Sequence, residues 1–270
     1  MSDGFYTHIL TSGRSENTAK TYLNNLRVYQ RWCAAHEMDA PSAERVTVQA
    51  YLSDEIGRLG RNTVALRLSG LHAYYAFISR PEVTYGLSVK REKLAPRKPL
   101  AESDLETLLR ACRNERDRAM ITVTMECGLR VSEVVGLRKN DVNLLDATLL
   151  VRGKGAKQRW VTLSARTLNA LTPFVVGSTG ILWHTREGKA VTVQRAKRNM
   201  WEIEQRAGIH AHYHRLRTTF AARFLGKMHD LDSLQTLMGH ADANTTRRYA
   251  AYGAQERALE QMRRFSDPMI

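Results

Sequence analysis

Hydrophobic residues recur every three or four positions through residues 1–88, a spacing that predicts an all-helical segment. One set lies on a single helix face: Tyr22, Leu26, Tyr29 and Trp32. A second set, which we expect to end at Gly60, comprises Val48, Leu52, Ile56 and Leu59. A third, with Asn62 as its candidate N-cap, comprises Val64, Leu68, Leu71, Tyr75 and Ile78. We expect these residues to form a core.

The pattern breaks at residues 89–98, where charged residues and a proline indicate a linker. Ser103 and Glu106 have the spacing of a capping box, which predicts a new helix at that point. A further helix through residues 120–127 runs into Gly128, a candidate C-cap. The pattern of residues 149–151 and 160–163 predicts two short strands joined by a turn. The helical pattern returns after residue 165 and continues to about residue 264.

Composition narrows the class of protein. The sequence has no run of about 18 apolar residues, as a membrane span requires, and its N-terminus lacks the pattern of a signal peptide. The three cysteines have no metal-binding spacing, so we expect a cytoplasmic protein with no metal site. Residues 1–88 hold nine Lys/Arg and eight Asp/Glu, a net charge of +1. Residues 89–270 hold the remaining 32 Lys/Arg and 19 Asp/Glu, a net charge of +13. A polyanionic partner would therefore bind mainly the C-terminal two-thirds.

Two glycine-containing motifs carry candidate chemistry. Gly128 allows one helix to end and another to begin, which places Arg130 at the turn and Glu133 within reach to orient it. The plainer alternative is a capped helix with a surface ion pair. The second motif is the turn around Lys154, which has a glycine on each side and can therefore approach another molecule closely. The plainer alternative here is a solvated hairpin.

Two further motifs contain histidine. His214 and Arg217 are three residues apart, so on a helix both side chains can address the same group. His240 follows a glycine and precedes Tyr249 by nine residues. For His214 and Arg217, the plainer alternative is a helix with exposed basic residues. For Tyr249, it is a half-buried aromatic side chain, and Tyr252 is a second candidate for the same role.

In this order the motifs of residues 100–255 resemble the catalytic set of the tyrosine recombinases, also called the phage integrase family, of the two-domain Xer/Cre-like form. The resemblance implies a mainly α fold with a small antiparallel β-sheet. Residues 1–88 would be a helical core-binding domain of SAM-like type, residues 89–98 a linker, and residues 99–270 an α/β catalytic domain with a C-terminal tail helix. Thr218 and Met238 stand where many members have histidine and leucine, and neither difference removes a catalytic group.

The resemblance also implies a reaction. Tyr249 would be the nucleophile that attacks a DNA phosphate and forms a 3′-phosphotyrosine, and Lys154 would protonate the departing 5′ oxygen. The planar forks of Arg130 and Arg217 suit the two non-bridging phosphate oxygens. The covalent link conserves the bond energy, so no cofactor and no metal is expected.

The remaining roles and partners follow from the same resemblance. His214 and His240 would supply hydrogen bonds and help move protons, with Glu133 in support of Arg130. The expected partner is double-stranded DNA with inverted repeats, bound by a tetramer on the nucleoid. Two alternatives stay open: a relaxing enzyme of the type IB topoisomerase kind, which needs no partner site, and a catalytically silent DNA-binding regulator.

Overall fold

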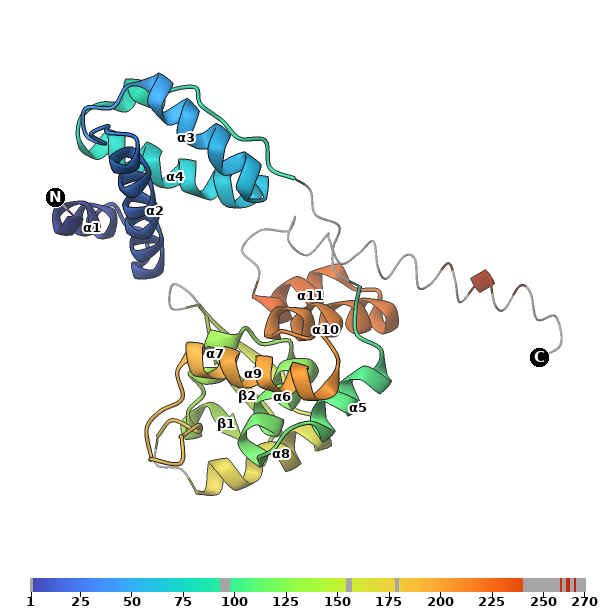
Figure 1. Cartoon of the computed structure of the whole chain (residues 1–270). Coiled ribbons are helices and arrows are strands. Elements are labelled where there is room, and N and C mark those ends of the chain that lie inside the picture. Colours follow the sequence, from blue (N-terminus) through green and yellow to red (C-terminus); the bar gives the residue numbers. More distant parts are fainter. Residues whose placement is uncertain are drawn as a thin grey trace. The chain divides into compact units, whose positions relative to one another are not determined.

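The computed structural model describes residues 2–92, 98–153, 157–177 and 180–239, together with Ala258, Gln261, Met262 and Phe265. The chain divides into two compact units, Met1–Ala95 and Pro96–Ile270 (Figure 1). Residues 93–97 of the expected linker lie outside the described part. Across the described ranges, no helix is both long and apolar enough to cross a membrane.

Unit 1 is helical, as the spacing of its hydrophobic residues predicts. Its elements are α1 (Ser2–Thr11), α2 (Glu16–Ala35), α3 (Arg45–Arg58), α4 (Arg61–Phe77) and the 3-10 turn η1 (Pro81–Val83). Helix α2 packs against α1 and α4, and α3 packs against α4. Of the side chains expected in the core, Ile56 is 36% exposed, while Tyr29 and Tyr75 are fully buried. The Tyr29 and Tyr75 hydroxyls lie 2.9 Å apart, and Tyr75 donates to the Ala40 carbonyl at 2.8 Å.

Two helix starts differ from the sequence prediction. Helix α4 begins after Gly60, whose carbonyl accepts the first helical hydrogen bonds, and Asn62 lies inside the first turn instead of capping it. Helix α5 (Glu102–Arg110) begins after Ala101, not Ser103. The Asp104 carboxylate accepts from the Ala101 N–H at 3.2 Å, so it supplies the reaching-back contact that Glu106 was expected to make.

Unit 2 combines helices with one small sheet. Its helices are α5, α6 (Glu115–Cys127), α7 (Val131–Val135), α8 (Ala165–Val176), α9 (Val193–Ala207), α10 (Tyr213–Met228) and α11 (Leu231–Met238), with the 3-10 turn η2 (Lys139–Asp141). The helical pattern expected after residue 165 is interrupted between α8 and α9, where His184 forms an isolated β-bridge with Ala190.

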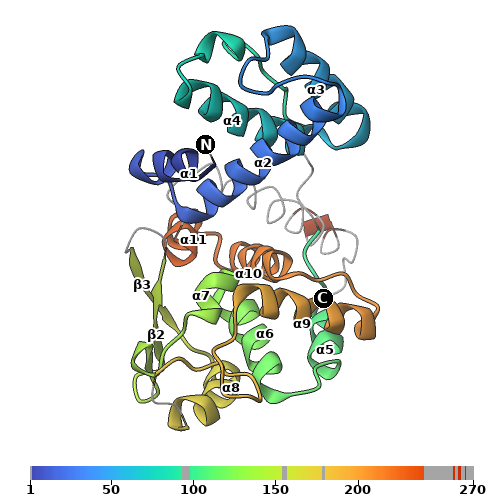
Figure 2. The ribbon, with the colours of Figure 1, turned by 60° about the vertical axis from the view of Figure 1, so that its left-hand side comes forward.

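The sheet contains both predicted strands and one that the sequence did not reveal. It has the order β1 (Val142–Asn143), β2 (Thr148–Arg152) and β3 (Gln158–Thr162), all antiparallel, and Figure 2 shows β2 and β3 side by side. In the β2–β3 register, Val151 lies opposite Arg159 and Leu149 opposite Val161. Leu149, Val151 and Val161 are buried, so the face that also carries Arg159 points toward the core.

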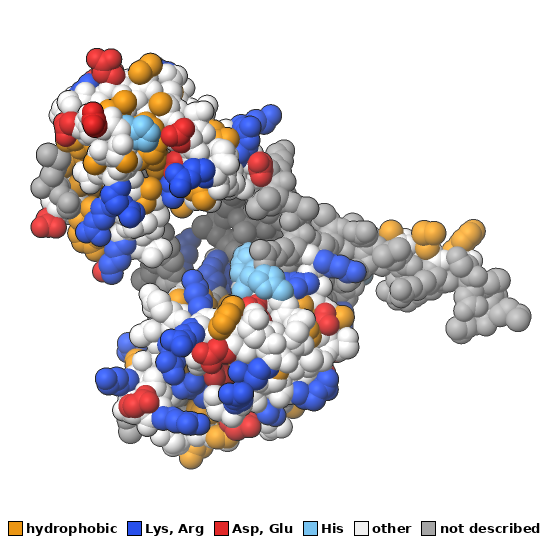
Figure 3. Space-filling model, in the orientation of Figure 1, with side chains coloured by type: hydrophobic (Ala, Val, Ile, Leu, Met, Phe, Trp, Pro, Cys, Tyr) orange, Lys and Arg blue, Asp and Glu red, His pale blue; other side chains and the backbone are white. Residues whose placement is uncertain are grey.

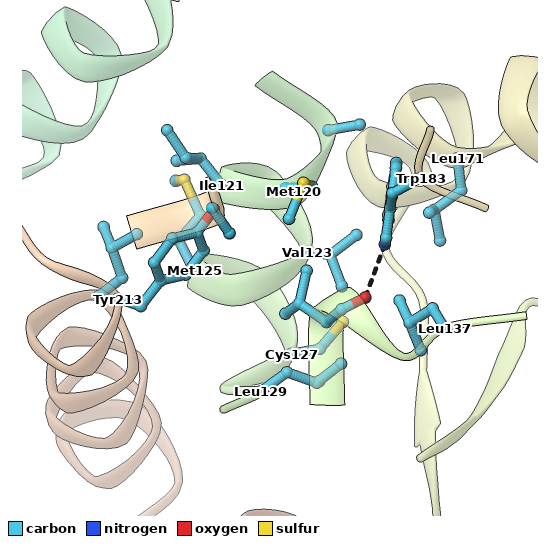
Figure 4. Packing of buried hydrophobic residues seen from close by; sticks show 14 of the residues in the cluster. Met120, Ile121, Val123, Met125, Cys127, Leu129, Leu137, Leu171, Trp183 and Tyr213 are labelled. Atoms are coloured by element: carbon cyan, nitrogen blue, oxygen red, sulfur yellow. Dashed lines mark hydrogen bonds between the residues drawn. The ribbon is translucent and has the colours of Figure 1, made fainter. Parts of the chain in front are cut away.

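Helix α6 is the centre of the core of unit 2. It packs against both α8 and α10, and it buries hydrophobic side chains on most of its circumference (Figure 4). Trp183 is fully buried beside it, and its indole N–H donates to the Val134 carbonyl in α7 at 2.6 Å. Since Val134 follows Glu133, this bond holds the short helix that carries one of the candidate site residues.

Candidate active site

The junction between α6 and α7 positions Arg130. Gly128 ends α6 in the left-handed conformation, with φ 65°, and Arg130 is the N-cap of α7. Glu133, three residues later, accepts from the Arg130 backbone N–H through Oε2 and from its Nη1 through Oε1, both at 2.8 Å. The contact predicted from the spacing is therefore present, and it fixes the direction of a guanidinium that is 40% exposed.

Glu133 is the buried centre of a cluster of arginines. Its side chain is 3% exposed, and it accepts from Arg159 Nη1 at 3.1 Å and from Arg159 Nη2 at 2.9 Å. Arg217 Nη1 lies 3.7 Å from Glu133 Oε2, and its side chain is also 3% exposed. With Arg130, three guanidiniums surround one carboxylate, so the cluster carries a net positive charge in a mostly buried site.

The ionisation of Glu133 reflects these neighbours. Burial raises the pKa of Glu133, because a buried carboxylate prefers to be neutral. Hydrogen bonds from Arg159 and from the Arg130 N–H, together with the charges of Arg159 and Arg217, outweigh burial and hold the pKa below its usual value. Glu133 is thus an anion that keeps the arginines together.

The same three arginines contact the end of α11. Arg159 Nε donates to the Leu237 carbonyl at 2.6 Å, Arg217 donates to the Met238 carbonyl, and Arg130 Nη2 donates to the Gly239 carbonyl at 3.1 Å. The last carbonyls of a helix lack helical partners and carry a partial negative charge, which favours cations there. Elements far apart in the sequence thereby converge on one helix end.

Helix α10 supplies two candidate residues with different surroundings. His212 caps the helix by accepting from the Arg215 N–H at 3.0 Å. Two residues later, His214 is exposed, whereas Arg217 is buried and also donates to the Gly128 carbonyl. Arg217 therefore belongs to the cluster, whereas His214, three residues before it, lies at the surface.

Three candidate residues, Lys154, His240 and Tyr249, lie outside the described residues. The described chain does reach the flanks of two of them. Gly153 closes the base of the Lys154 turn by donating to the Lys157 carbonyl at 2.7 Å. His240 directly follows Gly239, which has φ 59° and ends α11. Within the described ranges, no group of three or more His, Cys, Asp or Glu could hold a metal ion.

Sequence comparison identifies the family. Residues 98–256 match the profile of the "Phage integrase family", and residues 3–81 match "Phage integrase, N-terminal SAM-like domain". The first match covers more than half of the chain. The chain belongs to the phage integrase family. This confirms the resemblance drawn from the motifs, and it makes the protein a tyrosine recombinase, an enzyme that breaks and rejoins DNA at specific sites.

Among curated relatives within this family, the tyrosine recombinase XerC of Chromobacterium violaceum is 32% identical over 94% of this chain and 90% of its own length. The tyrosine recombinase XerD of Pseudomonas putida is 31% identical over 89% of this chain and 88% of its own. Both relatives are therefore similar to the chain across both units.

Solved structures show the fold. XerH site-specific recombinase, in a post-cleavage complex with palindromic difH substrate, has a TM-score of 0.71 at 22% identity over 92% of this chain and 80% of that one. A lambda integrase dimer bound to a COC′ core site, residues 75–356, has a TM-score of 0.74 at 16% identity over 92% and 93% of the two chains. The predicted fold class, mainly α with a small antiparallel sheet, is confirmed.

Sequence reasoning about this phage integrase missed one member of the cluster. The motifs of the sequence did not point to Arg159, yet its side chain is 9% exposed and bonds to Glu133 twice. The signal lay in the strand pattern. Arg159 and Val161 are two positions apart, so they share a face of β3, and a charge on the core face of a strand requires a buried partner.

Proposed function

We propose that this recombinase cleaves duplex DNA with Tyr249, which forms a 3′-phosphotyrosine and releases a 5′ hydroxyl. The Tyr249 oxygen forms a bond to phosphorus as the bond to the 5′ oxygen breaks. Lys154 gives a proton to the 5′ oxygen, and His214 and His240 help to move the proton that Tyr249 loses. Attack by a different 5′ hydroxyl reverses these steps and joins new partners.

The observation that carries this proposal is the convergence of Arg130 and Arg217 on Glu133. A phosphodiester gains negative charge in its transition state, so fixed cations lower the barrier. Arg130 is held by Glu133 and by the Gly239 carbonyl, yet 40% of its side chain remains exposed to a ligand. The guanidinium therefore needs little rearrangement when a phosphate arrives.

The charge of the chain supports double-stranded DNA as the partner. Residues 89–270 carry a balance of +13, and Figure 3 shows Lys and Arg side chains spread over the visible face of unit 2. Phosphate contacts of this kind position a protein on DNA more than they select a sequence. We further propose that unit 1 is the core-binding domain, and that exchange between two sites uses four copies of the chain in a tetramer on DNA.

The nucleophile can be tested with a nicked substrate from which the released strand diffuses away, so that the covalent adduct accumulates. Wild-type protein is expected to form an adduct that survives denaturing electrophoresis. Tyr249→Phe is expected to bind the same DNA and form none, because it lacks the attacking oxygen. Tyr252→Phe is the matched control and keeps the adduct. If Tyr252→Phe were inactive and Tyr249→Phe active, Tyr249 would not be the nucleophile.

A further inference from the structure

All three nitrogens of the Arg159 guanidinium donate hydrogen bonds within the protein. It is the second residue of β3, on the face that points toward the core. Nη1 and Nη2 donate to the two oxygens of Glu133, and Nε donates to the Leu237 carbonyl at 2.6 Å. With its side chain only 9% exposed, its guanidinium is fixed in direction and largely shielded from solvent.

The hydrogen bonds from Arg159 fix the Glu133 carboxylate, which in turn holds Arg130. Each carboxylate oxygen accepts one bond from Arg130 and one from Arg159: Oε1 from Arg130 Nη1 and Arg159 Nη1, Oε2 from the Arg130 N–H and Arg159 Nη2. Arg159 also provides the strongest influence that lowers the pKa of Glu133, against the opposing effect of burial. Without Arg159, the carboxylate would lose half of these donors and could rotate, and Arg130 would rotate with it.

Arg159 also touches the segments on either side of the cluster. A Cβ added at Gly239 would lie 3.1 Å from Arg159 Nη1, so the backbone at the end of α11 packs against the guanidinium. A Cβ at Gly153 would lie 3.7 Å from Glu133 Oε1 and 4.0 Å from Arg159 Nη1. The base of the Lys154 turn and the residue before His240 thus lie beside Arg159, and the Arg130 turn is joined to Arg159 through Glu133.

We propose that Arg159 is a positioning residue for DNA cleavage, which acts through Glu133 on Arg130. It does not contact the scissile phosphate. The inference rests on the proposed function, because cleavage is the reaction that the positioning serves. A residue of this kind governs the rate of the chemical step and leaves DNA affinity almost unchanged.

The test compares Arg159→Lys with Arg152→Lys in the full-length protein. Lysine keeps the charge but cannot donate in three fixed directions. Arg152 is the matched control: it lies on the adjacent strand, its Nε donates to the buried carboxylate of Asp141, and its Nη2 forms an ion pair with the same oxygen. With saturating nicked DNA, Arg159→Lys is expected to slow adduct formation about 100-fold, and Arg152→Lys to change it little. DNA affinity is expected to be similar in all three proteins.

A double variant separates positioning from independent effects. If Arg159 acts through Arg130, then adding Arg159→Lys to Arg130→Ala should slow cleavage by no more than about twofold beyond Arg130→Ala alone. Multiplied losses, or a full cleavage rate in Arg159→Lys, would overturn the inference. If Arg159→Lys does not fold, Gly239→Ala replaces it, since its Cβ would lie 3.1 Å from Arg159 Nη1 and push the guanidinium aside slightly while every charge is kept. Its cleavage must then also slow, and an unchanged rate overturns the inference.

The two proposals fail in different ways. If wild-type protein forms no covalent adduct, the proposed function is wrong. If wild-type protein forms the adduct and Arg159→Lys forms it equally fast, the function stands and the role of Arg159 is wrong.

Discussion

Gly128 and Gly208 offer a matched pair for testing how the Arg130 turn is built. Both glycines end a helix in the left-handed conformation with φ 65°, Gly128 after α6 and Gly208 after α9. They differ in what an added Cβ would meet. At Gly128 the Cβ would lie 2.3, 2.7 and 3.0 Å from three atoms of the Phe220 ring, and at Gly208 it would meet nothing within 4 Å.

The expected free energies follow from this difference. An L-residue in the left-handed conformation costs about 1–2 kcal/mol, which both Gly→Ala variants share. Carbon atoms pack best at about 3.5–4.0 Å, so Phe220 must move in Gly128→Ala, and overpacking of this kind costs about 1–3 kcal/mol more. We therefore expect Gly208→Ala to lose about 1–2 kcal/mol of unfolding free energy and Gly128→Ala about 2–5 kcal/mol.

The assay is urea unfolding followed by tryptophan fluorescence, which reports mainly on unit 2 because Trp160, Trp183 and Trp201 lie there. In thermal unfolding, the extra loss corresponds to a Tm about 2–12 °C lower for Gly128→Ala than for Gly208→Ala. Cleavage should also slow only in Gly128→Ala, because the Gly128 carbonyl accepts from Arg217. Equal stabilities in the two variants would refute the steric argument.

Two further predictions concern Glu133 and Lys154. The lowered pKa of Glu133 means that its contribution to stability is present above its unfolded value of 4.5 and is lost as pH falls through the folded value. In urea unfolding at a series of pH values, the stability difference between wild type and Glu133→Gln should therefore shrink below about pH 4.5, and a constant difference would contradict the assignment. Lys154→Ala should cleave normal DNA about 100- to 10,000-fold more slowly but cleave DNA with a bridging 5′ sulfur almost normally, because sulfur leaves without a proton. Lys157→Ala should show only a modest binding defect with both substrates, and rescue of Lys157→Ala by sulfur with Lys154→Ala left inactive would exchange the two roles.

Local patterns in the sequence predicted local structure well. The C-cap at Gly128, the contact of Glu133 with Arg130 and the strands around residues 150 and 160 depend on neighbours within a few positions, and all are present. Helix starts were less predictable. Asn62 and Ser103 have good capping side chains, but Gly60 and Ala101 begin these helices, because backbone carbonyls and the Asp104 carboxylate serve instead.

The assembled site was harder to predict, because its contacts join distant parts of the chain. Arg130 and the Gly239 carbonyl are 109 residues apart, and Arg159 and the Leu237 carbonyl are 78 apart. Every residue has a backbone carbonyl whatever its type, so no sequence motif identifies the end of α11 as a hydrogen-bond acceptor. The roles of Lys154, His240 and Tyr249 stay predictions that rest on the family motifs.

The bonds between the three arginines and α11 have a consequence for how this protein can vary. The acceptors at positions 237–239 are backbone carbonyls, so a change of side chain at Leu237 or Met238 leaves the acceptor atom in place. An insertion or deletion is different. Each residue of an α-helix turns the chain by about 100°, so one extra residue within α11 would rotate all three acceptors away from their donors together. Helix α11 is therefore expected to tolerate drift in residue type near its end far better than any change in its length.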